Sequence, residues 1–273
     1  MDTFEYESFL EELTATLAAD PLVLGLITLG STADAASRDR WSDHDFWVIT
    51  APDSQARYLD NVAWLPRADD ILMIVRHGPS RRTILYTNRH KAEYAVFDSE
   101  EAVSGKIERF RVLIDRGDIN GLAESIRLQT HNDRMSGLAR PDKLENLCLL
   151  LSTAHERWER GERLSAQRYV QFAIDSFLDL LAAHDGLSRT RAADELEPRR
   201  RLERIEPELG RELGRVDSLS PAEAGVVLLE LAQKRLSARA PELAWDKASV
   251  VVKWFQEAVD AARAEQASER PAR

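Results

Sequence analysis

The sequence of 273 residues contains a single cysteine, Cys148, so no disulfide can form within the chain. Such cysteine usage is typical of a reducing compartment, and we therefore expect a cytoplasmic protein. No apolar run approaches the roughly 20 residues that a membrane-spanning helix needs. The first residues, Met1-Asp2-Thr3-Phe4-Glu5, also lack the basic start and apolar core of a signal peptide. We therefore expect a soluble protein without a membrane partner.

Positive charge is scarce, above all in the first part of the chain. The net charge is -10, and residues 1–118 carry 13 Lys and Arg against 21 Asp and Glu, a balance of -8. A negative domain repels a nucleic-acid backbone and attracts cations. We therefore expect no nucleic-acid partner, and the charge favours a small cationic or polar substrate. An acidic surface that only keeps the protein in solution is the alternative explanation.

Residues 1–118 show strand-like patterns between short helical ones. Helical spacing predicts a helix over residues 3–19 and short helices near residues 32–36 and 54–59. A capping box, Asp98-Ser99-Glu100-Glu101, predicts a further helix to about Phe110. Apolar runs predict strands over residues 22–29, 43–50, 71–75, 83–86, 92–97 and 111–115.

After residue 118 the apolar positions recur at helical spacing. Stripes over residues 144–158, 169–181, 221–236 and 248–259 predict a bundle of antiparallel helices, with breaks at Gly161 and near Gly186. Residues 264–273 lack apolar anchors and are predicted to form a flexible tail. The chain is thus predicted to be α+β, with domains at 1–118 and 119–263.

Two aspartates head the second predicted strand. Asp43 and Asp45 are one residue apart, so they project from the same face, with His44 on the opposite face. Like charges held this close need a cation between them, and Mg²⁺ with a nucleotide is the first hypothesis. The preceding strand ends in Gly30-Ser31, a pattern typical of a phosphate-binding turn.

This pattern resembles the signature of the polymerase-β-like nucleotidyltransferase superfamily: Gly30-Ser31, a loop over residues 32–42, then Asp43-His44-Asp45 before an apolar run. The segments after residue 83 are similar to its aminoglycoside and lincosamide nucleotidyltransferases. The resemblance is strong over residues 20–118 and weak afterwards. It implies a nucleotidyltransferase domain with a mixed sheet flanked by helices, a substrate-binding helical bundle, and a third carboxylate on a neighbouring strand.

Glu93 and Asp98 compete for the third position. A charged residue within the apolar strand is costly unless it has a ligand or partner, whereas Asp98 already serves as a helix cap. We therefore choose Glu93, as a metal ligand or as the general base. Arg38 and Arg40 could contact phosphates, and an exposed loop charge is the alternative interpretation for both. His44 is expected to pack beneath its strand.

The predicted reaction is the Mg²⁺-dependent transfer of AMP from ATP to a hydroxyl group of a small polar acceptor, as in aminoglycoside-like antibiotics. Asp43 and Asp45 would bind the metal and the nucleotide, Gly30 would permit close approach of the backbone, and Ser31 would donate to the phosphates. We expect the acceptor to lie between the two domains. The alternatives are an adenylyltransferase that acts on a protein partner and a catalytically silent nucleotide-binding module. A monomer and a homodimer are both compatible with the sequence.

Overall fold

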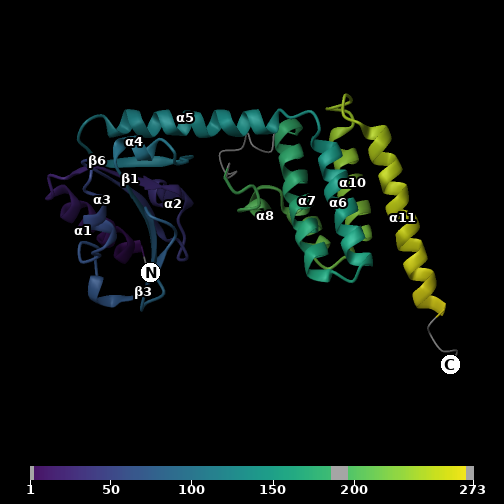
Figure 1. Cartoon of the computed structure of the whole chain (residues 1–273), viewed down its shortest axis with the longest axis horizontal. Coiled ribbons are helices and arrows are strands. Elements are labelled where there is room, and N and C mark those ends of the chain that lie inside the picture. The colour runs from purple at the N-terminus through teal and green to yellow at the C-terminus, as the bar shows by residue number, and fades with distance from the viewer. Residues whose placement is uncertain (1–2, 186–195, 269–273) are drawn as a thin grey trace. The chain divides into compact units, whose positions relative to one another are not determined.

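A computed structural model describes residues 3–185 and 196–268 of the chain (Figure 1). The chain divides into two compact units, residues 1–132 and 133–273, and the division falls within helix α5 (Ile119–Leu138). The boundary predicted after residue 118 lies at the start of this helix, and as a domain boundary it stays a prediction. None of the helices in the described ranges has the length and hydropathy of a membrane-spanning segment.

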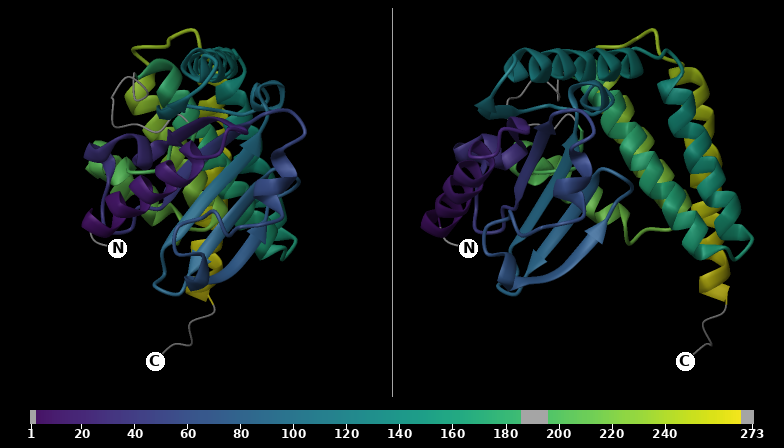
Figure 2. Two further views of the ribbon diagram at one scale, coloured as in Figure 1. Left: turned by 90° about the vertical axis from the view of Figure 1, so that its left-hand side faces the viewer. Right: turned by 60° about the vertical axis from the view of Figure 1, so that its left-hand side comes forward.

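The first unit is built around one sheet of six strands. The strands are β1 (Val23–Leu29), β2 (His44–Thr50), β3 (Ile71–Arg76), β4 (Arg81–Tyr86), β5 (Lys91–Phe97) and β6 (Phe110–Asp115). Their order across the sheet is β3-β4-β5-β2-β1-β6. Strands β2 and β5 pair in parallel and the other neighbours are antiparallel, so the predicted mixed sheet is confirmed. Figure 2 shows the strands side by side.

Helices cover both faces of this sheet. Helices α1 (Thr3–Ala18) and α3 (Gln55–Leu59) pack on one face, where Leu13 of α1 and Phe46 of β2 belong to one buried apolar cluster. Helix α4 (Ser99–Ala102) and the first half of α5 pack on the other face, where Trp47 and Ile126 share a second cluster. Successive residues of β2 thus point into different clusters, as the strand period requires.

Helix α4 is shorter than predicted. The capping box is present, with the Asp98 side chain accepting from Glu101 N and the Glu101 side chain accepting from Asp98 N. The predicted extension to Phe110 is wrong, because the helix ends at Ala102 and Phe110 starts β6. A Cβ atom on Gly105 would lie 2.2 Å from the Trp47 ring, so the chain passes too close to that ring for a larger residue.

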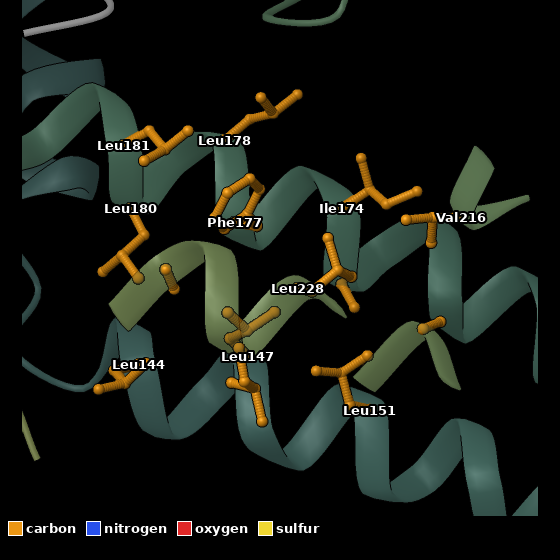
Figure 3. Packing of buried hydrophobic residues seen from close by; sticks show 14 of the residues in the cluster. Leu144, Leu147, Leu151, Ile174, Phe177, Leu178, Leu180, Leu181, Val216 and Leu228 are labelled. Atoms are coloured by element: carbon orange, nitrogen blue, oxygen red, sulfur yellow. The ribbon is translucent and has the colours of Figure 1, made fainter. Parts of the chain in front are cut away.

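The second unit is helical, which together with the sheet confirms the α+β class. Its helices are α6 (Lys143–Glu159), α7 (Arg163–His184), α8 (Leu202–Ile205), α9 (Pro207–Val216), α10 (Pro221–Leu236) and α11 (Trp245–Ser268). Figure 3 shows Leu147 of α6, Phe177 of α7 and Leu228 of α10 in the core between these helices. Helix α10 starts with the capping box of Ser220 and Glu223, followed by proline at its first position.

Helix α11 ends later than expected, and the expected end of α7 cannot be compared with the structure. Helix α11 continues through Ser268, whereas we expected a flexible tail from residue 264. The segment Ala264-Glu265-Gln266-Ala267 is made of residues with high helix propensity, which prolong a helix without apolar anchors. Residues 269–273 and Gly186, where α7 was expected to end, lie outside the described residues.

Phe177 and Phe172 on the same helix allow a matched test of this core. Phe177 is fully buried, whereas Phe172 is 40% exposed. We expect Phe177→Ala to lower the free energy of unfolding by about 3–5 kcal/mol, because it leaves a cavity in a close-packed core. Phe172→Ala should cost much less. Urea unfolding followed by circular dichroism measures both values, and equal losses would contradict the packing described here.

Candidate active site

The site starts where β1 ends. Gly30 follows the strand with φ of +52°, a left-handed conformation that glycine adopts without strain, and its N–H donates to the carbonyl of Arg109 at 3.1 Å. The chain then forms the short helix α2 (Gly30–Ala33) and a 3₁₀ turn, η1 (Ala35–Ser37), before the loop to β2. A Cβ atom on Gly30 would lie 3.7 Å from Oδ2 of Asp45. This turn and the Asp45 carboxylate are therefore close neighbours.

The parallel pairing of β2 and β5 aligns the acidic residues. Asp45 and Glu93 face each other in the register of the two strands. Asp43 lies two residues before Asp45 and shares its face. This is the face that carries Trp47 further along β2, on the side of α4 and α5.

Lys91 stands among the three carboxylates. Its Nζ donates to Oδ2 of Asp43 at 3.0 Å and lies 4.0 Å from Oε1 of Glu93. The hydrogen bond to Asp43 raises the pKa of Lys91, and the negative charges of Asp43, Glu93 and Asp45 act in the same direction. The Asp43 side chain is 17% exposed and that of Lys91 47%, so water reaches the ammonium and screens this pair in part. Sequence reasoning missed Lys91, although a lysine two residues before a strand carboxylate shares its face.

Thr32 and Tyr6 hold the backbone of the two aspartates. The Asp45 N–H donates to Oγ1 of Thr32 at 2.8 Å, and the Tyr6 hydroxyl donates to the Asp43 carbonyl at 2.7 Å. The two hydroxyl groups are 2.9 Å apart. Burial is the main cause that raises the pKa of Tyr6 to about 12, so the phenol keeps its proton. The sequence predicted neither residue for the site. Tyr6 belongs to α1, and only the folding of the chain brings it to the turn.

His44 packs beneath the strand, as expected. Its ring is fully buried, with its centroid 3.7 Å from the Tyr6 ring and 4.4 Å from the Phe9 ring. The carbonyl of Tyr6 can only accept, so His44 donates from Nε2 at 3.1 Å and accepts at Nδ1 from Nε2 of His90 at 2.8 Å. Burial lowers the pKa of His44 to about 2 and of His90 to about 4. Both rings are therefore neutral at physiological pH.

The residues of the turn and loop have different surroundings. Ser31 is 3% exposed, and its Oγ is buried without a hydrogen-bond partner among the described residues. Arg38 donates to the carbonyls of Ser31 and Thr32, each at 3.0 Å, and pairs with Glu7. Arg38 is thus neither a solvated charge nor available for phosphate. The guanidinium of Arg40 lies 4.7 Å from the exposed Trp41 ring, so its predicted contact with phosphate stays a prediction.

The structure changes the reason for choosing Glu93 over Asp98. The Glu93 side chain is 48% exposed, so the argument that its burial requires a ligand was wrong. Its register opposite Asp45 places it beside the other carboxylates instead. Asp98 caps α4 and accepts from Nε2 of Gln55 at 3.1 Å.

In the second unit, basic residues neutralise the acidic face of α7. Asp175 accepts from Nε of Arg199 at 2.6 Å. Asp179 lies 3.9 Å from Arg134 and 3.7 Å from Lys143. These carboxylates therefore already have cationic partners, and a substrate amine would compete with them.

The carboxylates gathered in the first unit are the type of ligand that binds a hard cation. Asp43, Asp45 and Glu93 offer only carboxylate oxygens, the ligands that Mg²⁺ prefers. Among the residues that the structure describes, however, no three acidic, histidine or cysteine side chains are arranged to hold a metal ion. The ammonium of Lys91 supplies the positive charge near Asp43 instead. A metal bound by Asp43 would therefore compete with Lys91.

Neither a protein-family model nor a curated protein matches the sequence. Several solved structures are similar to the chain, and they include the following two. An aminoglycoside 6-adenyltransferase from Bacillus subtilis is 13% identical, with a TM-score of 0.39 and coverage of 92% of this chain and 97% of that one. A nucleotidyltransferase-like protein from Exiguobacterium sibiricum is 13% identical, with a TM-score of 0.38 and coverage of 86% and 77%.

The neutral pair of His44 and His90 makes stability depend on pH. Both pKa values are lower in the folded protein than the ordinary value of 6.5. Below pH 6.5 the unfolded chain therefore binds protons that the folded chain does not. As the pH falls from 6.5 to 5, we expect the free energy of unfolding to fall by up to about 1.4 kcal/mol per pH unit for each histidine.

Urea unfolding across this pH range measures the slope. His90→Gln removes one of the two titrating groups and should reduce the slope by about half. An unchanged slope in this variant would show that the pair is not the cause.

Proposed function

We propose that this protein is a nucleotidyltransferase that moves AMP from ATP to a hydroxyl group of a small polar acceptor and releases pyrophosphate. The observation that carries the proposal is the gathering of Asp43, Asp45 and Glu93 around Lys91, beside the turn at Gly30. Carboxylates concentrated on one face of a sheet suit a reaction that needs a divalent cation and a base.

Asp43 and Asp45 would hold Mg²⁺, and Glu93 would either complete a second metal site or act as the general base. When bound, the ion would neutralise negative charge that builds up on the α-phosphate. The fit is supported by the all-carboxylate donor set and by the buried, unpartnered Oγ of Ser31, for which a phosphate oxygen would be an acceptor. Arg40 is the remaining residue that we assign to the phosphates.

Residues of the chain would remove the proton of the acceptor hydroxyl and hold the two aspartates in position. Glu93 as the base takes the proton of the acceptor hydroxyl, and that oxygen bonds to the α-phosphorus. The bond from the α-phosphorus to the oxygen that bridges to the β-phosphate breaks, so pyrophosphate leaves with that oxygen. Thr32 and Tyr6 keep Asp45 and Asp43 in place through their backbone groups. Lys91 offsets the repulsion among the carboxylates.

For the acceptor we favour an aminoglycoside-like or similar polar antibiotic. The support is the sequence resemblance to antibiotic-modifying enzymes and the balance of -8 over residues 1–118, which attracts a cation. Asp175 and Asp179 of α7 already pair with Arg199 and Lys143, so we do not assign the cationic group of the acceptor to them. A protein acceptor would use the same catalytic residues, so the product must be identified directly.

Asp45→Asn tests the assignment of the nucleotide and metal ligand. We expect weak ATP binding and loss of pyrophosphate release by at least a thousandfold, because the amide removes one negative charge from the site. Asp53→Asn is the control, since Asp53 lies in the turn after β2 in a left-handed conformation that asparagine tolerates. Full pyrophosphate release by Asp45→Asn would refute the proposal.

Glu93→Gln, combined with an antibiotic panel, tests the base and the acceptor together. A host that expresses the protein should become resistant to at least one aminoglycoside-like compound, and the variant should abolish that resistance. Glu100→Gln, on the exposed side of α4, should leave it intact. Radiolabelled AMP on a protein instead of a small molecule would favour the protein-modifying alternative, and no labelled product with any acceptor would favour a silent module.

Lys91→Met tests the competition for Asp43. Removal of the ammonium should tighten Mn²⁺ binding about fivefold, because an ion pair of this exposure contributes up to about 1 kcal/mol. Electron paramagnetic resonance of free Mn²⁺ measures the affinity without any turnover. Lys106→Met, at an exposed position, should leave the affinity unchanged. Weaker binding in Lys91→Met would mean that Lys91 does not compete with the cation.

A further inference from the structure

Helix α2 ends in two buried carbonyl groups that it cannot satisfy itself. The last four carbonyl groups of an α-helix have no partner within the helix, and in this short helix they include those of Ser31 and Thr32. Ser31 is 3% exposed and Thr32 is fully buried, so bulk water does not reach these oxygen atoms. A buried carbonyl without a hydrogen-bond donor lowers stability, so another part of the chain has to supply the donors.

Arg38 supplies these donors from the loop that leads to β2. Its Nε donates to the carbonyl of Ser31 and its Nη2 to the carbonyl of Thr32, each at 3.0 Å. Its Nη1 pairs with Glu7 of α1, and the guanidinium lies 4.7 Å from the centroid of the Tyr6 ring. The Arg38 side chain is only 11% exposed. One guanidinium thus joins the turn to α1.

These hydrogen bonds fix the orientation of the peptide groups in the turn. The described peptide bonds are all trans, so each carbonyl and the N–H that follows it point to opposite sides. Because the carbonyls of Ser31 and Thr32 point at the guanidinium, the N–H groups of Thr32 and Ala33 point away from it. Thr32 also accepts from the Asp45 N–H through Oγ1, at 2.8 Å. The position of Asp45 therefore depends on the residue that Arg38 holds.

We propose that Arg38 is a positioning residue of the nucleotide site. It holds the turn that receives the phosphates and, through Thr32, the carboxylate of Asp45. This inference rests on the proposed function, because it assigns the turn to the phosphates of ATP. In this role Arg38 does not touch the nucleotide. It acts on the backbone of the turn from the side that the N–H groups of Thr32 and Ala33 point away from.

The arrangement requires a guanidinium and not only a positive charge. A guanidinium is planar and carries five N–H donors in a fixed fork, so it can serve two carbonyls and a carboxylate while its face lies on an aromatic ring. An ammonium is a compact charge with three donors and cannot make this set of contacts. The pair with Glu7 also compensates the charge of Arg38, so the site does not use that charge to attract phosphate.

Replacement of Arg38 by methionine tests this role through nucleotide binding. Arg38→Met should weaken the binding of ATP with Mg²⁺ by about tenfold or more in isothermal titration calorimetry, because the turn and Asp45 lose their common support. Arg116→Met is the matched control, since Arg116 donates to the carbonyls of Asp20 at 2.8 Å and Val23 at 3.0 Å, at the other end of β1. Both variants lose hydrogen bonds to the backbone, but Arg116→Met should keep the wild-type affinity.

Hydrogen exchange gives a readout that does not depend on any reaction. The Asp45 N–H is bonded to Thr32, so a loosened Thr32 should expose this amide to exchange with water. By NMR we expect the Asp45 amide to exchange about tenfold faster in Arg38→Met than in the wild type or in Arg116→Met. Equal rates in Arg38→Met and the wild type would show that Arg38 does not hold Asp45, and would overturn the inference.

Two further variants separate the geometry of the guanidinium from its charge. Arg38→Lys keeps the charge and should bind ATP as weakly as Arg38→Met. Addition of guanidinium ion to Arg38→Ala should restore ATP binding, whereas methylammonium at the same concentration should not. A lysine variant with wild-type affinity would overturn the inference, because charge alone would then suffice.

The wild-type protein distinguishes failure of this inference from failure of the proposed function. A wild type that binds no ATP would overturn both. Unchanged ATP affinity in Arg38→Met, beside a wild type that binds ATP and releases pyrophosphate, would overturn only the role of Arg38.

Discussion

Repulsion among the carboxylates of Asp43, Asp45 and Glu93 is the constraint around which the first unit is organised. Parallel pairing of β2 and β5 sets Asp45 and Glu93 opposite each other, and Asp43 shares their face. Lys91 places one ammonium among these three negative charges, and its raised pKa reflects all of them. A surplus of negative charge remains, and binding of a divalent cation would relieve it. The same repulsion that costs stability would thus favour binding of the metal–nucleotide complex that we propose as substrate.

The opposite face of β2 supplies the rigidity that such a cluster needs. His44, between the two aspartates, is held by the rings of Tyr6 and Phe9 and by a hydrogen bond to His90. Tyr6 and Thr32 bind the backbone of the aspartates directly. Because His44 and His90 are neutral, their two rings add no positive charge beneath the carboxylates. Helix α1 therefore contributes to the geometry of the candidate site without offering a reacting group.

The second unit combines an apolar core with a polar face that is already paired. Asp175 and Asp179 of α7 lie against Arg199, Arg134 and Lys143. Basic partners thus offset much of the negative charge of this unit. This agrees with the sequence, in which residues 1–118 carry -8 of the net charge of -10. A cationic acceptor that binds to these carboxylates would have to displace their present basic partners. Binding would therefore depend on the position of the acceptor's charged groups as well as on the sign of their charge.

The sequence by itself determined the features that depend on short-range physics. Strand alternation put Asp43 and Asp45 on one face, capping boxes marked the starts of α4 and α10, and apolar spacing marked the main helices, because each of these depends on residues a few positions apart. Only the tertiary structure decided what joins distant segments: the register of Asp45 with Glu93, the place of Lys91, and the contacts of Tyr6. The early end of α4 and the contacts of Arg38 also belong to this group. Strand order and close packing create these features, and local periodicity carries no information about either.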